Sequence, residues 1–305
     1  MDLRDIEYFA VIAKHGHLGR AAEALGLGQP ALSISLRRLE KSAEAKLVKR
    51  TPKGVELTAV GAALLTHVRR LQLARDDLAR EVSDVAHGQA GHLHVGTGPA
   101  TADGFLPDAC STLLKDAPKI TLDVSIAAST DELLPGLRNG DLDIIVTHVS
   151  NVPREGLVRE PLWEDEFVVY ASVLHRLARR RSVALADLVQ ERWVTTAASA
   201  LLAWQSLRRT FEERGLPLPQ FALISDSGML NRQMVASLGL LGIASKRTVE
   251  QNAGNLGLKI IPVTDVKWIR PVAVVYRKDG YLSPVARRFI EILKKTAKAI
   301  SAGKD

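Results

Sequence analysis

The chain has 305 residues, of which 46% are hydrophobic and 25% are charged, and this composition is typical of a soluble globular protein. The composition excludes a disordered or collagen-like chain, and the length predicts two or three domains. The net charge is +7, and seven basic but only two acidic residues lie between Leu32 and Lys53. This region is therefore the first place to look for a negatively charged partner.

The N-terminal segment predicts three helices. Apolar side chains of residues 3–13 form one broad stripe, with Leu3 at its start and Asp5 outside it. A second, short helix ends at Gly26. A third begins near Gln29, because the proline that follows is well suited to a first helical turn.

The third predicted helix has two distinct faces. Its leucines at positions 32, 36 and 39 recur at helical spacing and face the core. Gln29, Ser33 and Arg37 then form an outward polar row, with Arg38 beside it. Two short helices with such a row have the shape and chemistry to read the major groove of DNA. An ordinary solvated helix face is the alternative from this segment alone.

A basic hairpin follows the third helix. Residues 47–50 and 55–58 read as two short strands joined by a Thr-Pro-Lys-Gly turn, with Lys49, Arg50 and Lys53 near the tip. A hairpin in this position is a wing that can touch phosphates or the minor groove. The helix pair and the wing together favour DNA binding over a solvated face.

A long helix is predicted from Thr58 to about His87. Apolar residues recur in it every seven positions, and Arg75 interrupts the intervening positions. The seam residues are Leu64, Leu71, Leu78 and Val85, with Val68 and Val82 between them. About 30 residues make a rod of roughly 45 Å, too long to pack only on its own small domain. We therefore expect a coiled coil that joins two chains, and Arg75 could fix its register.

The N-terminal sequence resembles the LysR-type transcriptional regulators. The resemblance rests on LRDIEYFAVIAKHGHLGRAAEALGLGQPALSISLRRLEKSAEAKLVKRTPKGVELTAVGAALL. The chain departs from the family's usual Ser-Gln-Pro at Gly28, from its usual Ser-Phe-Thr at residues 17–19, and from its usual Phe at Val48. Gly28 is nearly as good an N-cap as serine, so the third helix should remain intact.

The resemblance implies a winged helix-turn-helix that contacts a two-fold site in double-stranded DNA. The DNA-contacting positions carried over are Arg20, Gln29, Pro30, Ser33, Arg37, Arg50 and Lys53. The family usually activates transcription through RNA polymerase, so RNA polymerase is an expected partner, and it often represses its own gene. We expect a dimer or tetramer.

From Gly91 onward, strand-like runs alternate with helical segments, which predicts α/β units around mainly parallel sheets. The resemblance implies two α/β subdomains like those of periplasmic solute-binding proteins. The predicted organisation is a DNA-binding domain (1–58), a linker and dimerisation helix (59–90) and an effector-binding domain (91–305), whose subdomain I comprises 91–162 and 266–305 and whose subdomain II comprises 163–265.

Ligands collect at the carboxyl ends of strands in such sheets. The positions read off there are Ala100, Thr101, Ser129, Thr147, His148, Thr196, Ser199 and Ser227. This hydroxyl-rich, weakly charged set suits a small organic anion such as a carboxylate, while a neutral polar ligand remains open. Serine and threonine also cap helices whatever the function, and Ser129 with Glu132 predicts a capping box.

The sequence offers no catalytic motif. The stretch VGTGPATADG lacks the third glycine of a dinucleotide fingerprint and a Walker lysine, and no G-x-S-x-G motif occurs. His87, His92 and His94 lack the further ligands of a metal site. Cys110 is the only cysteine and is expected to be a buried helix residue. We expect no enzyme activity, no cofactor and no metal.

The function predicted is that of a sequence-specific transcriptional regulator controlled by a small effector. With no signal peptide and no apolar stretch long enough to span a bilayer, we expect it in the cytoplasm and not at a membrane. One alternative is a solute-binding or enzymatic α/β protein whose N-terminal helices only mediate oligomer contacts. Another is an architectural DNA binder without sequence preference, which would bind all DNA similarly with a steep salt dependence.

Overall fold

The computed structural model describes residues 1–87, 91–149, 152–195 and 199–302. These form two compact units, Met1–Val82 and Ser83–Asp305. The first unit contains α1 (Leu3–His15), α2 (Leu18–Ala24), α3 (Gln29–Ser42), β1 (Val48–Thr51), β2 (Gly54–Leu57) and most of α4 (Ala59–His87). The three short helices, the hairpin and the long helix predicted from the sequence are therefore confirmed, with small differences at their ends.

The first unit packs around the leucines predicted to face inward. Leu32, Leu36 and Leu39 of α3 are buried together with Phe9 and Ile12 of α1. The N-cap Asp2 accepts a hydrogen bond from the backbone N–H of Arg4, and Gly16, in the left-handed region, ends α1. Leu3 was expected on the buried stripe but is 68% exposed, because it lies in the first turn, at the edge of the core.

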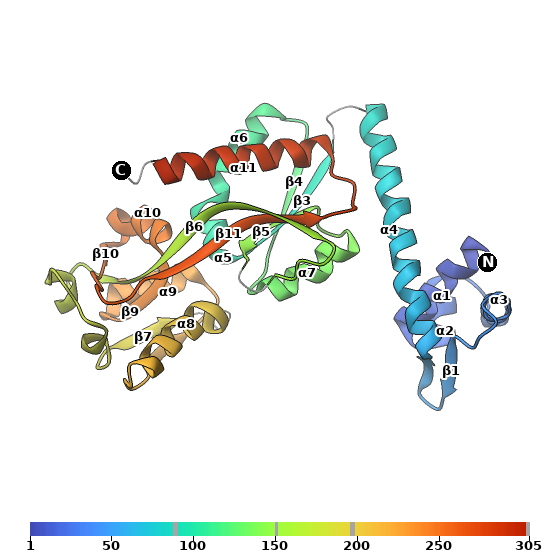
Figure 1. Cartoon of the computed structure of the whole chain (residues 1–305), viewed down its shortest axis with the longest axis horizontal. Helices are drawn as coiled ribbons and strands as arrows, with labels where there is room; N and C mark the ends of the chain where they lie inside the picture. Colours follow the sequence, from blue (N-terminus) through green and yellow to red (C-terminus); the bar gives the residue numbers. More distant parts are fainter. Residues whose placement is uncertain (88–90, 150–151, 196–198, 303–305) are drawn as a thin grey trace. The chain divides into compact units, whose positions relative to one another are not determined.

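The second unit is built on one mixed sheet (Figure 1). Its described strands are β3 (His92–Thr97), β4 (Thr121–Ile126), β5 (Ile144–His148), β6 (Leu157–Ser172), β7 (Arg192–Thr195), β8 (Gln220–Ile224), β9 (Leu241–Ser245), β10 (Leu258–Ile260) and β11 (Trp268–Arg277). Their order is β4-β3-β5-β11-β6-β9-β7-β8, with β10 beside β6. Its helical segments are α5 (Pro99–Gly104), α6 (Leu106–Asp116), α7 (Thr130–Asn139), η1 (Arg176–Arg179), η2 (Leu185–Leu188), α8 (Ser199–Glu213), α9 (Gly228–Leu238), α10 (Lys246–Leu256) and α11 (Pro284–Ala302).

Neighbouring strands run parallel at both ends of this sheet, as predicted, but antiparallel in its centre. The pairs of β3 with β4 and β5, and of β7 with β8 and β9, are parallel. In the middle, β6 and β11 run antiparallel to each other from Trp268 opposite Phe167 to Arg277 opposite Leu157. These two long strands join the halves of the sheet. Of β6, β9 and β11, the strand-like runs of the sequence include only EFVVYA, residues 166–171, in the second part of β6.

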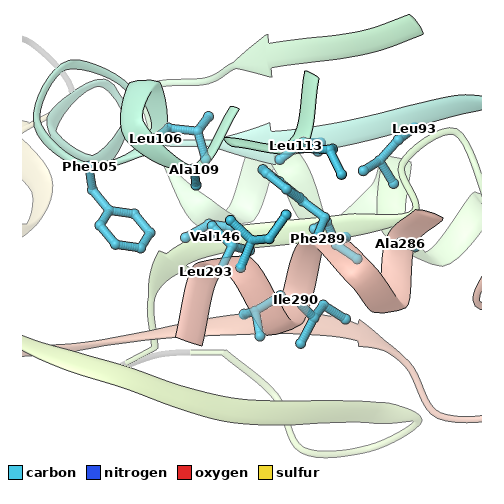
Figure 2. Packing of buried hydrophobic residues seen from close by; sticks show 14 of the residues in the cluster. Leu93, Phe105, Leu106, Ala109, Leu113, Val146, Ala286, Phe289, Ile290 and Leu293 are labelled. Atoms are coloured by element: carbon cyan, nitrogen blue, oxygen red, sulfur yellow. The ribbon is translucent and has the colours of Figure 1, made fainter. Parts of the chain in front are cut away.

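Each half has its own hydrophobic core. In the first half, α6 and α11 lie side by side over the sheet (Figure 1). Figure 2 shows side chains such as Leu113 of α6 and Phe289 of α11 among those of the strands. Val146 of β5 faces this core, whereas its neighbour Ile145 faces α7 on the other side of the sheet, as strand alternation requires. Trp193 and Phe211 anchor the core of the second half.

Candidate functional site

The polar row of α3 lies on the solvent side of the first unit. Gly28 caps the helix without a side-chain hydrogen bond. Arg37 donates from Nε to the carbonyl oxygen of Ser33 over 3.3 Å. Of the positions carried over from the family, Arg20, Gln29, Pro30, Arg37, Arg50 and Lys53 are exposed and Ser33 is half-buried. The amide and guanidinium groups predicted to read bases are therefore accessible.

Arg38, beside the polar row, is bonded to Asp5 of the same unit. It donates to both carboxylate oxygens of Asp5 in α1, over 3.1 Å from Nε and 2.6 Å from Nη2. The Ser35 hydroxyl donates to the same carboxylate over 2.5 Å. The hydrogen bond from Arg38 is the main cause of a lowered pKa of Asp5, and the bond from Ser35 adds to it against the effect of burial. Asp5 was placed outside the buried stripe, yet it is only 3% exposed.

The wing is fixed to the turn between α1 and α2. The backbone N–H of Val55 donates to the carbonyl oxygen of Gly16 over 2.9 Å. At Gly54, φ is +134°, and an added Cβ would lie 2.2 Å from that same oxygen. Only glycine permits this approach. The rigid attachment presents Arg50 and Lys53 in a defined position beside the helix pair.

Helix α4 leaves part of its apolar seam uncovered. Val68 is fully buried in the core of the first unit and Leu64 packs on that core. Beyond them Leu71, Leu78 and Val82 are 50%, 60% and 60% exposed. Arg75, expected to interrupt the seam, is held within the chain by Glu7 and Asp76. The seam thus has an exposed apolar part that continues past the small domain.

The second unit contains a cavity of about 390 Å³ between the two halves of its sheet. Its walls include the turn after β3, the turn before α7, the end of β5, the second part of β6, the start of β11, and the starts of α9 and α10. Five of the predicted effector positions line it, namely Ala100, Thr101, Ser129, Thr147 and His148. Ser227 caps α9 by accepting a hydrogen bond from Leu230, between the lining residues Asp226 and Gly228. Thr196 and the side chain of Ser199 lie outside the described residues.

Several polar side chains of the wall are hydrogen-bonded within the second unit. The hydroxyls of Thr130 and Thr147 lie 2.7 Å apart. Ser129 donates to a carboxylate oxygen of Glu132 over 3.0 Å and makes no side-chain cap, so the predicted capping box is wrong: the hydroxyl meets the glutamate side chain instead of the backbone. His148 Nε2 lies 3.2 Å from Asp165 Oδ2.

Arg270 is the cavity residue that the sequence analysis missed. It is the third residue of β11, is only 9% exposed and lines the cavity. Its guanidinium donates to the Ser206 hydroxyl over 3.2 Å and lies 4.9 Å above the Phe167 ring. Burial lowers the pKa of Arg270 to about 10, against the opposing field of Asp165, so the group is charged at neutral pH. Among the described residues, no carboxylate forms an ion pair with it.

A second arginine contributes to the same wall. Arg232 of α9 lies 3.2 Å, Nη1 to Oδ2, from Asp103 of α5. Three buried polar atoms on lining residues have no hydrogen-bond partner, and these are Arg232 Nε, Asn231 Oδ1 and Thr248 Oγ1. The predicted wall of hydroxyl groups is therefore corrected: two arginines and two aspartates, Asp103 and Asp226, also line it. Arg232 lies one turn into the helix that Ser227 caps, and Arg270 lies near the start of a strand and not at its carboxyl end.

Comparison with known proteins assigns the chain. Residues 3–62 match the bacterial regulatory helix-turn-helix protein, lysR family, and residues 86–298 match the LysR substrate binding domain. The chain belongs to the LysR family.

Relatives of this LysR-family chain match over nearly its whole length. It is 26% identical to the HTH-type transcriptional regulator GbpR of Azospirillum brasilense over 96% of this chain and 86% of that protein. It is 27% identical to the DNA-binding transcriptional dual regulator OxyR of Escherichia coli strain K12, over 100% of this chain and 96% of that protein.

Solved structures share the fold of this LysR-family chain. A full-length OxyR variant from Pseudomonas aeruginosa superposes with a TM-score of 0.64 at 22% identity, over 98% of this chain and 95% of that one. Full-length CbnR complexed with its target DNA gives a TM-score of 0.62 at 20% identity, over 97% of this chain and all of that one.

Membership of the LysR family makes the chain a DNA-binding transcriptional regulator with a substrate-binding domain rather than an enzyme. In the part of the chain that the structure describes, no helix is long and apolar enough to cross a membrane. Within the same residues, no three His, Cys, Asp or Glu side chains are grouped so as to hold a metal ion.

Proposed function

We propose that the protein binds a two-fold DNA site as a dimer or tetramer, and that a small organic anion in the cavity of the second unit controls its effect on transcription. The observation that carries the effector assignment is Arg270. A buried guanidinium that lines a cavity, makes no ion pair and is compensated only by the field of Asp165 favours the binding of an anion. A small carboxylate with an apolar body suits this cavity, whose volume is at the lower end for small-molecule sites.

The proposed DNA-contacting residues are the seven carried over from the family. Exposure of Gln29 and Arg37 on α3 supports base contacts in the major groove, since these side chains pair with adenine and guanine respectively. Exposure of Arg50 and Lys53 on the wing supports contacts to phosphates or the minor groove. Arg38 is omitted because Asp5 already holds it.

The proposed means of self-association is α4. The exposed positions Leu71 and Leu78 are one heptad apart, and such a seam is stabilised by a second copy of itself. The proposed organisation remains 1–58 for the DNA-binding domain, 59–90 for the linker helix and 91–305 for the effector-binding domain. Subdomain I then comprises 91–162 and 266–305, and subdomain II comprises 163–265.

The proposed effector site combines Arg270 with the eight predicted positions. An anion bound there changes the closure of the two halves and so the spacing of the DNA-binding units, which is a shift between populated states. The regulator then acts on RNA polymerase in the cytoplasm, as an activator, a repressor or both.

Sensing of peroxide is a second candidate, since relatives from Escherichia coli are named hydrogen peroxide-inducible genes activators. The chemistry of this chain disfavours it. Oxidation begins at a thiolate. Cys110 is the only cysteine, so no disulfide can form within the chain, and burial raises its pKa to about 11. A bound small molecule therefore explains the second unit better than thiol oxidation.

The test is binding of the purified protein to genomic DNA fragments at near-physiological salt, with and without a pool of small carboxylates. Enrichment of a two-fold motif, and a footprint altered by one carboxylate, are the expected results. Retention of DNA fragments that share no motif would mean that Gln29 and Arg37 contact the DNA backbone and do not read bases. An unchanged footprint with every carboxylate, together with an altered one with neutral analogues, would overturn the anionic effector.

A further inference from the structure

Two arginines tie the halves of the second unit together at α5 and α6. Arg232 of α9 bonds Asp103 of α5 over 3.2 Å. Arg247 of α10 bonds Asp108 of α6 over 2.8 Å and also donates to the carbonyl oxygen of Gly104. Helix α6 belongs to the core of the first half, and α9 and α10 to a core of the second. Both ion pairs therefore cross from one half to the other.

The two ties differ in how well the arginine is satisfied. Arg247 uses Nη2 for the carboxylate and Nε for the backbone carbonyl, so two nitrogens of its guanidinium are bonded. Arg232 meets Asp103 through Nη1 alone, and its Nε is buried without a partner. An arginine gains most from a carboxylate that binds it with two parallel hydrogen bonds. Asp103 leaves this potential unused.

Position and exposure also distinguish the ties. Both members of the Arg232–Asp103 pair line the cavity, whereas Arg247 and Asp108 do not. The Arg232 side chain is 11% exposed and that of Asp103 is 42% exposed. Asp103 can therefore leave for water at little cost, but Arg232, which is mostly buried, needs a replacement anion when it does.

We propose that the effector is a dicarboxylate, with one carboxylate bound to Arg270 and the other to Arg232, where it displaces Asp103. This inference rests on the proposed function of the cavity. Asp103 acts as an internal competitor: it occupies Arg232 in the absence of effector and ties α5 to α9. Binding of the second carboxylate breaks that tie, while the Arg247–Asp108 tie outside the cavity persists. A monocarboxylate satisfies Arg270 only and leaves α5 attached.

The test compares binding of succinate, adipate and phthalate with that of butyrate, hexanoate and benzoate, by calorimetry on the full-length protein. Wild type is compared with Asp103→Asn, which removes the competitor with little change of shape. We expect the affinity for the best dicarboxylate to rise about fivefold or more in Asp103→Asn, in the range of typical coupling between sites. The affinity of Asp103→Asn for the monocarboxylate with the same apolar body should change much less.

Two further variants separate competition at Arg232 from a general effect of removing a negative charge. Asp108→Asn breaks the other tie and should leave both affinities unchanged. Arg232→Gln alone should lose the preference for dicarboxylates. In that variant, Asp103→Asn should not raise the affinity for dicarboxylates, because the arginine for which Asp103 and the ligand compete is absent. Such non-additivity is the signature of direct coupling.

The outcomes also separate this inference from the proposed function. If carboxylates bind in a manner that needs Arg270 but Asp103→Asn and wild type bind dicarboxylates equally, the anionic effector stands and the competitor role of Asp103 is overturned. If dicarboxylates bound Asp103→Asn but not wild type, Asp103 would exclude the ligand completely, which would support its role as a competitor. If no carboxylate binds either protein, both proposals fail.

Discussion

Arg38 of α3 and Asp5 of α1 form a two-point ion pair, with 2.6 Å between Nη2 and Oδ1 and 3.1 Å between Nε and Oδ2. The carboxylate is buried and also bonded by Ser35, whereas the Arg38 side chain is 62% exposed. This contact fixes α3 against α1. It therefore sets the orientation of the outward residues of α3.

Replacement of Asp5 by alanine should destabilise the first unit. The Ser35 hydroxyl would be left buried without its partner, which costs about 1–3 kcal/mol. Thermal unfolding of the full chain measures this change. Because the pKa of Asp5 is lowered by folding, its contribution is complete above the ordinary value of 3.8 and is lost as pH falls through the lower folded value. The part of the difference between wild type and Asp5→Ala that comes from the ion pair with Arg38 should thus disappear only in strong acid, whereas the part from Ser35 persists. A difference that does not change with pH would contradict the ionic contribution.

Gln29→Ala and Lys53→Ala should weaken DNA binding in different ways. Loss of a two-point base contact at Gln29 should cost about 1–3 kcal/mol at one position of the site and relax its sequence preference. Loss of a phosphate contact at Lys53 should weaken binding to all sequences alike and reduce the salt slope by about 1. Titrations of wild-type and altered sites at several salt concentrations distinguish the two. If Gln29→Ala lost the same affinity on every DNA sequence, Gln29 would contact the DNA backbone and not a base.

Leu78→Asp should halve the mass of the assembly. A carboxylate in the exposed seam of α4 would be buried between two chains, and a coiled coil does not tolerate that at an apolar position. Sedimentation equilibrium gives the mass directly. Leu174→Asp is a matched control, since Leu174 is 76% exposed in the second unit and outside the seam. An unchanged mass for Leu78→Asp would mean that α4 is not the dimerisation element.

Arg270→Gln should abolish most of the affinity for organic anions. A hydrogen bond to a charged group is worth about 1.5–3 kcal/mol, so we expect roughly a tenfold to hundredfold loss. The melting temperature of the ligand-free protein should fall much less than the affinity, because the substitution also removes a buried charge. Calorimetry and thermal unfolding measure the two effects. Arg214→Gln, which changes an exposed arginine paired with Asp265, should alter neither.

The sequence predicts the first unit well because its determinants are local. Leucines at helical spacing set the faces of α3, and a Thr-Pro-Lys-Gly turn sets the wing. The same holds for part of the cavity. Thr101 and Ser129 follow strands that are apolar enough to recognise, and Thr147 lies at the end of another. Parallel strands bring their carboxyl ends to one edge.

The missed features depend on contacts between distant segments. Strand β11 carries Arg270 and Pro271 near its start, and a proline argues against a strand when neighbours are unknown. Nothing near Asp5 in the chain indicates that an arginine 33 residues away will bury it. Arg232 likewise resembles any exposed helix arginine until α9 is placed against α5. Charged residues of this kind are identified by their surroundings and not by their spacing.

The strands β6 and β11 make the junction of the second unit a hydrogen-bonded ribbon and not a pair of free linkers. Such a ribbon resists stretching but yields to twisting, so the halves can rotate about it without drawing apart. Its register slips between Val272 and Ala273, and an irregularity of this kind increases local twist. The junction thus favours rotation of one half against the other over separation of the two, and this rotation is the motion on which the proposed effector would act.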